Sequence, residues 1–223
     1  MYTTNKFTDR RNFIIKTAAV ATGLTSLALF PQTGFGQQTS TDDDINIVGP
    51  KQGYSPQIGT LVSMMTWMRM VVLSSVEKLN QQELDFLFDA HSNTIGALLL
   101  HLAAAESFYQ TNTFGETSLK DFSETDKKRW DIPMNLGDAA RKSIKGHDLK
   151  YYTDTLSEVR EITLAAFRKR DDEWLMKVDP KFFGGKPTNN YCKWFHVCEH
   201  ESNHNGQIKW LAKRLPGVKP DNE

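Results

Sequence analysis

The stretch between residues 189 and 215 has a helical pattern with a histidine at every fourth position. His196, His200 and His204 follow one another at this spacing, and residues four apart lie on one face of an α-helix, with Cβ atoms about 5–6 Å apart. The aliphatic residues that share this face are Val197, Ile208, Leu211 and Leu215. Two imidazoles on successive turns can bind one metal ion, so the spacing predicts a metal site on an apolar helix face.

Apolar residues at helical spacing predict three further long helices, over residues 57–79, 92–110 and 148–169, and Ser92 is a suitable N-cap for the second. A short helix is predicted over residues 137–144. No segment shows the convincing alternation of a β-strand. The prediction is therefore an all-α four-helix bundle, in which the long connection after the second helix allows the second and third helices to run parallel.

The second predicted helix supplies a third histidine on an apolar face. His101 lies on the line formed by Leu98 and Ala105. Burying three neutral imidazoles without partners costs on the order of several kcal/mol, whereas one divalent ion satisfies all three. We therefore predict a metal site formed by His101, His200 and His204, with histidines that only form hydrogen bonds in the core as the alternative.

His196 competes as a ligand, because it lies one turn before His200 and only about 40° off the same stripe. A straight helix cannot comfortably place three histidines that span two turns on one ion, so we expect His196 at the rim, where it supports the ligands. Cys198 points about 200° away from His200 and is a poor ligand candidate. Cys192 and Cys198 are separated by a helical rise of about 9 Å, beyond the roughly 7 Å limit for a disulfide, so both are expected to be free thiols.

Two carboxylates near the histidines have more than one interpretation. Glu201 could act as a general base on metal-bound water, or it could be a hydrogen-bonded helix residue. Glu106 could orient an imidazole, or it could pair with a cation at the bundle surface. The segment from His200 to His204 also matches the H-E-x-x-H motif of metallopeptidases. Those enzymes take their third ligand from downstream, and no histidine follows His204, so a peptidase is the least favoured interpretation.

Aromatic residues near the predicted site are also open to two interpretations. They could line a pocket for an organic substrate, or they could pack in the core. These residues are Trp67, Phe108, Tyr109, Trp194 and Phe195.

The N-terminus has the layout of an export signal. Arg10 and Arg11 precede Phe13, a weakly apolar run follows, and small residues lead up to Gly36. The paired arginines resemble a twin-arginine signal, so residues 1–36 are expected to direct export to the periplasm or the cell exterior. The apolar run is too short and too interrupted for a spanning helix, so no membrane anchor is expected after cleavage.

Length and charge limit the remaining choices. A chain of 223 residues is long enough for one well-packed core. Its 27 basic and 27 acidic residues lack the positive surplus of a nucleic-acid binder. We expect a flexible polar segment over residues 37–54, one bundle domain over 55–218 and a tail over 219–223, with a small molecule as the ligand or substrate.

Two segments carry a resemblance to a known family. The sequences from Leu100 to Glu106 and from Phe195 to Ile208 resemble the DinB-like family of metal-binding four-helix proteins, and the likeness extends over residues 55–215. The resemblance implies an up-down-down-up bundle with a long crossover between its second and third helices. It also implies one divalent ion, zinc or nickel, held by one histidine of the second helix and two of the last.

Carried over to this sequence, the ligands of the family are His101, His200 and His204, the same three that the helical spacing selects. Members of the family include transferases that use low-molecular-weight thiols, isomerases and proteins without known activity, and dimers are common among them. An open coordination position can bind water or a thiolate. We therefore expect an exported metal-dependent hydrolase or thiol-dependent transferase, with a non-catalytic metal- or ligand-binding protein as the alternative and a homodimer as one assembly.

Overall fold

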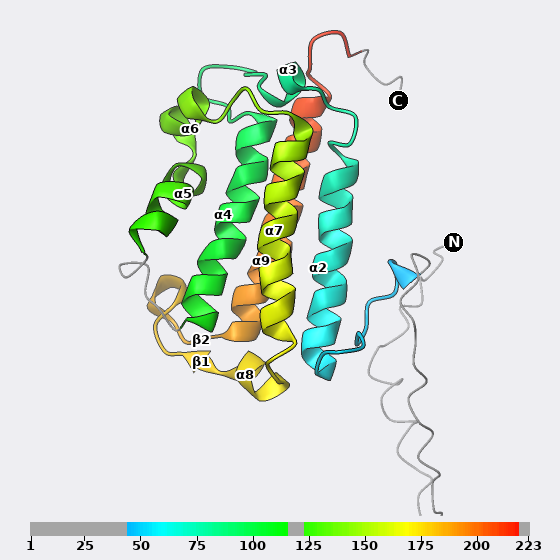
Figure 1. The fold of residues 1–223 in the computed structure, drawn as a ribbon, viewed down its shortest axis with the longest axis vertical. Helices are drawn as coiled ribbons and strands as arrows, with labels where there is room; N and C mark the ends of the chain where they lie inside the picture. The colour runs from blue at the N-terminus through cyan, green and yellow to red at the C-terminus, as the bar shows by residue number, and fades with distance from the viewer. Residues whose placement is uncertain (1–43, 116–122, 219–223) are drawn as a thin grey trace, which may run out of the picture. The chain divides into compact units, whose positions relative to one another are not determined.

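Four long helices form a bundle in the computed structural model, which describes residues 44–115 and 123–218. They are α2 (Pro56–Ser74), α4 (Ile95–Phe114), α7 (Leu149–Phe167) and α9 (Asn190–Ala212). In Figure 1, α2 and α9 run in one direction, and α4 and α7 run in the opposite direction. The predicted all-α, up-down-down-up bundle is therefore confirmed.

Short elements connect the long helices. They are α3 (Gln81–Leu84), α5 (Glu124–Asn135), α6 (Gly137–Ser143), α8 (Asp172–Met176), β1 (Val178–Asp179), η4 (Phe183–Gly185) and β2 (Thr188–Asn189). The crossover from α4 to α7 contains α5 and α6, and it returns the chain to the end of the bundle at which α4 began (Figure 1). The strands β1 and β2 form one antiparallel pair, which the sequence pattern did not predict.

Capping side chains determine where the helices begin. Thr94, and not the predicted Ser92, is the N-cap of α4, and its hydroxyl accepts a hydrogen bond from the backbone N–H three residues later at 3.1 Å. Ser92 instead belongs to a turn in which its N–H donates to the Asp89 carboxylate. Asp148 and Asn189 cap α7 and α9, so these two helices begin close to their predicted starts.

The end of α2 and the presence of α5 differ from the prediction. α2 ends at Ser74 and not at Leu79, because the backbone N–H groups of the following turns donate to carbonyls three residues back, as Leu79 does to Val76 at 2.9 Å. α5 was not predicted, because its sequence is highly charged and contains Pro133. Pro133 lies in the last turn, shortly before the helix ends at Asn135, and the N-cap at Ser123 was the available signal for this helix.

Residues 44–54, which were expected to form part of a flexible polar segment, contact α2. The Gly49 N–H donates to the Ser63 hydroxyl at 3.1 Å, and the Trp67 indole N–H donates to the Asn46 side chain at 3.2 Å. The expected export signal and the expected C-terminal tail lie outside the described residues. No helix within the described ranges is long and apolar enough to cross a membrane.

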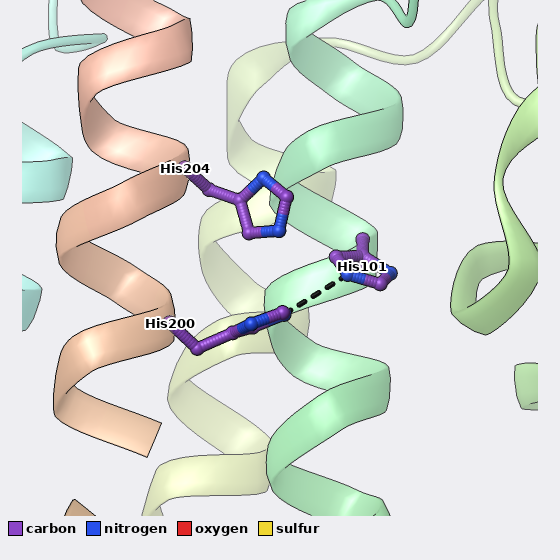
Figure 2. A group of neighbouring side chains, drawn as sticks. All are labelled: His101, His200 and His204. Atoms are coloured by element: carbon purple, nitrogen blue, oxygen red, sulfur yellow. Dashed lines mark hydrogen bonds between the residues drawn. The ribbon is translucent and has the colours of Figure 1, made fainter. Parts of the chain in front are cut away.

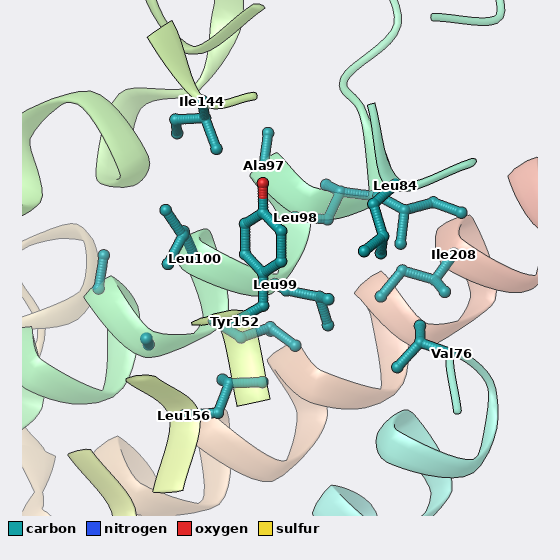
Figure 3. Packing of buried hydrophobic residues seen from close by; sticks show 14 of the residues in the cluster. Val76, Leu84, Ala97, Leu98, Leu99, Leu100, Ile144, Tyr152, Leu156 and Ile208 are labelled. Atoms are coloured by element: carbon teal, nitrogen blue, oxygen red, sulfur yellow. The ribbon is translucent and has the colours of Figure 1, made fainter. Parts of the chain in front are cut away.

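Two apolar clusters fill the interior of the bundle. In the first, Tyr152 of α7 packs beside residues 97–100 of α4, as Figure 3 shows. Gly96 permits this approach, since a Cβ atom there would lie 2.6 Å from the Tyr152 hydroxyl. The second cluster surrounds the fully buried ring of Trp194 on α9 and includes Phe167 of α7.

Four charged side chains, one from each long helix, lie along the bundle between residues of the first cluster and residues of the second. Arg69 of α2, Glu106 of α4, Arg160 of α7 and Glu201 of α9 are each at most 8% exposed, and we call them the charge layer. Arg160 donates to both oxygens of Glu106 at 2.8 and 3.1 Å, and Arg69 donates twice to Glu201 at 2.9 and 2.6 Å. Arg69 also donates to Glu106 at 2.9 Å, and Arg160 to Glu201 at 2.8 Å. The layer therefore ties all four helices together.

Backbone and hydroxyl groups add further hydrogen bonds to the charge layer, although Oε2 of Glu201 has no hydrogen-bond partner among the described residues. Each arginine donates one further N–H to a backbone carbonyl, at 2.8 Å for Arg69 and 2.9 Å for Arg160, and the Thr163 hydroxyl donates to Glu106 at 2.6 Å. Burial alone would raise the pKa of Glu106, but the two arginines outweigh it and hold this pKa below its ordinary value. Two positive and two negative charges are thus buried with partners, the condition under which burial of charge is tolerated.

Replacing Arg160 by leucine removes one cation and leaves two buried carboxylates with fewer partners. We expect the free energy of unfolding to fall by about 3–5 kcal/mol, the usual cost of removing one member of a buried ion pair. Arg129→Leu is the matched control, because Arg129 pairs with Glu158 at the surface, where such pairs contribute about 0–1 kcal/mol. Urea unfolding of both variants in a chelator measures the difference. Equal, small losses would contradict a central role for the charge layer.

Candidate metal centre

Three histidines from two helices converge where α4 meets α9. His101 projects from α4 toward His200 and His204 of α9, as Figure 2 shows. Each residue offers one ligand atom, and these atoms all lie within 4.8 Å of one another. The Nε2 atoms of His101 and His200 are 2.9 Å apart. The structure therefore brings together the three histidines that the sequence analysis selected as metal ligands.

In two of these rings, the other nitrogen faces a hydrogen-bond acceptor. Nδ1 of His101 lies 2.9 Å from the carbonyl oxygen of Pro133, in the last turn of α5, and Nδ1 of His204 lies 3.2 Å from Oε1 of Gln207. A carbonyl oxygen can only accept, so Nδ1 carries the hydrogen in both rings and Nε2 keeps its lone pair. Acceptors in this position fix the tautomer and the orientation of metal-binding histidines.

Burial keeps the three imidazoles neutral. It lowers the pKa of His200 to about 3, and the neighbouring His204, His101 and His196 add to this effect. Burial also lowers the pKa of His101 and the pKa of His204. Neutral imidazole is the form that binds a metal ion, because its lone pair is free.

The geometry and chemistry of the group fit a divalent ion. Two nitrogens bound to one tetrahedral zinc ion at about 2.0–2.1 Å lie roughly 3.3 Å apart. The closest pair here is 2.9 Å apart, and the whole group lies within 4.8 Å, so small side-chain rotations suffice to enclose an ion. His101 is buried, whereas His200 and His204 are half-buried. Three imidazoles leave a fourth coordination position for another ligand.

His196 lies beside the converging group and not within it. The centroid of its ring is 5.3 Å from that of His200, one turn later on α9. Its Nδ1 is 2.9 Å from the hydroxyl oxygen of Tyr109 on α4. The centroid of the His196 ring is 5.3 Å from the centroid of the Phe183 ring, which belongs to η4. His196 therefore occupies a rim position next to the three histidines.

Glu106 belongs to the charge layer. Its carboxylate accepts hydrogen bonds from Arg69, Arg160 and Thr163. The imidazole of His101, on the same helix, has the Pro133 carbonyl as its partner instead. Of the two interpretations of Glu106, the structure shows pairing with cations. These cations lie in the core, and the expected position at the bundle surface was wrong, because the arginines come from α2 and α7 on the inside of the bundle.

Glu201 also pairs with the arginines of the charge layer, a contact that fits the interpretation of a hydrogen-bonded helix residue. Arg69 and Arg160 were not among the residues predicted to be functional. A signal was present, since each follows a buried apolar residue by four positions, Met65 and Leu156 respectively, and so lies on the buried stripe of its helix.

Neither cysteine belongs to the group of histidines. Cys192 is exposed and Cys198 is buried, and both are free thiols, as the helical rise between them predicts. Burial raises the pKa of the Cys198 thiol to about 12. A thiol in this environment stays protonated and is a poor metal ligand.

The aromatic residues considered in the sequence analysis occupy different environments. Tyr109 and Trp194 are buried in the core, and Phe108 is half-buried beside them. Trp67 and Phe195 are exposed. Of this set, only Tyr109 has a hydrogen bond to a histidine near the candidate centre.

Replacing Gln207 by leucine removes the acceptor that orients His204. We expect metal affinity to fall by about tenfold, the lower end of the range for partners that orient metal ligands, because this contact is exposed. Asn203→Leu is the matched control, since Asn203 is also exposed on α9 but donates to Glu199. Competition with a chromophoric chelator measures both affinities. If the two variants bind metal equally well, the orienting role of Gln207 is wrong.

Comparison with known protein families finds a match over most of this chain. The family described as mycothiol-S-transferase matches residues 60–217, a range that includes the three converging histidines and most of the chain. No curated protein gives a significant match. The match confirms the resemblance to the DinB-like family, from which the up-down-down-up topology was expected. The chain belongs to the mycothiol-S-transferase family, which is a DinB-like family.

Proposed function

We propose that this protein is a metal-dependent S-transferase that joins the sulfur of a low-molecular-weight thiol to an electrophilic carbon. The observation that carries the proposal is the converging group of imidazoles of His101, His200 and His204. Three imidazoles on a tetrahedral ion would leave a fourth coordination position for another ligand. Membership of the mycothiol-S-transferase family favours thiol chemistry at such a site over the alternative of hydrolysis.

A divalent ion, zinc or nickel, held by the three Nε2 atoms would supply a positive charge that favours the thiolate form of a bound thiol. The proposed reaction forms one bond from sulfur to carbon. The thiol proton goes to solvent, and the leaving group departs with the electron pair of the bond that breaks. An ion that stabilises the thiolate therefore makes the nucleophile available at neutral pH.

The chain's own residues prepare the ligands for this task. The Pro133 carbonyl and the Gln207 side chain hold His101 and His204 with Nε2 free. Glu201, which follows His200 in the sequence, ties α9 to α2 and α7 through the charge layer. The ligand nitrogens are thus carried by helices whose relative positions are fixed, which lowers the cost of assembling the site.

Turnover by the metal-loaded protein tests the proposal. We expect protein loaded with zinc or nickel to conjugate a cysteine-derived thiol to 1-chloro-2,4-dinitrobenzene faster than the uncatalysed reaction, with release of chloride. Removal of the metal, or the double substitution His200→Ala and His204→Ala, should lower the rate by at least about 100-fold, since a metal contributes several kcal/mol to such reactions. The absorbance of the thioether product measures the rate.

His91→Ala is the control for the loss of a histidine as such. His91 is exposed on the loop before α4, so this variant should keep both the metal and the rate. A rate that is unchanged by metal removal would contradict the proposal. Metal-dependent cleavage of esters without consumption of thiol would support the hydrolase alternative in its place.

A further inference from the structure

Three neighbouring side chains beside the metal centre together provide hydrogen-bonding groups and an aromatic surface. They are Tyr109 of α4, Phe183 of η4 and His196 of α9. Their mutual contacts are short, with 2.9 Å between the Tyr109 oxygen and Nδ1 of His196, and 5.3 Å between the ring centroids of Phe183 and His196. Because His196 also lies against His200, at 5.3 Å between centroids, this group is within the reach of a small molecule bound at the metal centre.

The hydrogen bond from Tyr109 determines which nitrogen of His196 carries the hydrogen. Tyr109 is 4% exposed, and a buried hydroxyl needs an acceptor for its hydrogen. Its partner in the described structure is Nδ1 of His196, so the tyrosine donates and Nδ1 accepts. The neutral ring then carries its hydrogen on Nε2.

The Nε2–H group of His196 is available to a ligand. It lies 3.7 Å from a carboxylate oxygen of Glu199, which is longer than a hydrogen bond. The His196 ring is half-buried, so the N–H group is neither enclosed by the core nor fully exposed to solvent. A donor in this setting forms stronger hydrogen bonds than a donor that competes with bulk water.

The position of Phe183 beside His196 is fixed by the segment that carries it. Lys193 of α9 is 3% exposed, and its ammonium group donates to Asp179 and to Asn112 at 2.9 Å each. The same group lies 4.0 Å from the ring centroid of Phe182. This buried cation anchors the β1–β2 segment to α9 and so places the adjacent Phe183 ring beside His196.

We propose that Phe183 and His196 form the binding subsite for the electrophilic substrate, a compound that joins an aromatic or apolar body to a carbonyl oxygen. The Phe183 ring packs against the body, and the Nε2–H of His196 donates to the oxygen. Tyr109 is a positioning residue that fixes the tautomer of His196. The inference rests on the proposed S-transfer, which requires the electrophile to lie next to the bound sulfur.

Thiols that carry these groups covalently test the subsite, since they span the metal position and the subsite as the product would. The protein is loaded with cobalt(II), and the absorption band from sulfur to cobalt reports binding of each thiol without turnover. Three probes share the sulfur anchor: ethanethiol, phenylmethanethiol, which adds the ring, and 1-sulfanylpropan-2-one, which adds the carbonyl. Comparing the same thiol between protein variants cancels differences in thiol acidity.

We expect Phe183→Ala to lower the affinity for phenylmethanethiol by about threefold to tenfold, the contribution of one aromatic pair. The variant His196→Phe keeps a ring but loses the donor. We expect it to lower the affinity for 1-sulfanylpropan-2-one by about threefold to tenfold, the contribution of one hydrogen bond. Tyr109→Phe should lower the affinity for the same ketone by less than His196→Phe does. Phe88→Ala, which removes an exposed ring elsewhere, should change no affinity.

Ethanethiol binding separates this subsite from the proposed function. Unchanged ethanethiol affinity in every variant, together with the selective losses above, supports the subsite. Unchanged affinity of all three thiols in Phe183→Ala and His196→Phe overturns the subsite while S-transfer stands. Wild-type protein that binds cobalt but gives no band with any thiol contradicts the proposed function, and the subsite with it.

Discussion

The burial of two arginines and two glutamates between four helices is the constraint on which the rest of this structure depends. Each long helix contributes one charge, and each charge has partners on other helices. A helix that shifted by one turn would leave a buried charge unpaired, at a cost of several kcal/mol, whereas apolar contacts on either side could be exchanged for similar ones. We therefore regard the charge layer as the feature that sets the register of the bundle.

The register of α4 and α9 in turn determines the metal centre. His101 and Glu106 lie on α4, and His200 and Glu201 are adjacent on α9, so the pairing that aligns the glutamates with the arginines also aligns the histidines with each other. The crossover adds the remaining element, because α5 packs against α4 and presents the Pro133 carbonyl to His101. Helices that are distant in the sequence thus contribute the ligand atoms and the group that orients them.

Much of this arrangement could be predicted from the sequence. The histidines were found because imidazoles on an apolar helical stripe are conspicuous, and the same periodicity predicted the four long helices. Arg69 and Arg160 were missed, although they lie on buried stripes, because an isolated charge in an amphipathic helix is normally assigned to the solvent side. The contact of His101 with Pro133 could not be predicted. It joins α4 to α5, and the charged, proline-containing sequence of α5 did not predict a helix. The β1–β2 segment and its Phe183 were equally beyond reach, because two-residue strands leave no periodic signal.

The central claim is that three imidazoles bind one metal ion and leave one position open to a thiol. X-ray absorption spectroscopy of the zinc- or nickel-loaded protein, with and without a small thiol, measures this most directly. We predict three imidazole nitrogens and one exchangeable oxygen or nitrogen ligand at about 2.0–2.1 Å from the metal. When thiol is added, a sulfur atom at about 2.3 Å should replace the exchangeable ligand. A first shell of four protein ligands that does not change with thiol, or a protein that retains no metal, would contradict the account.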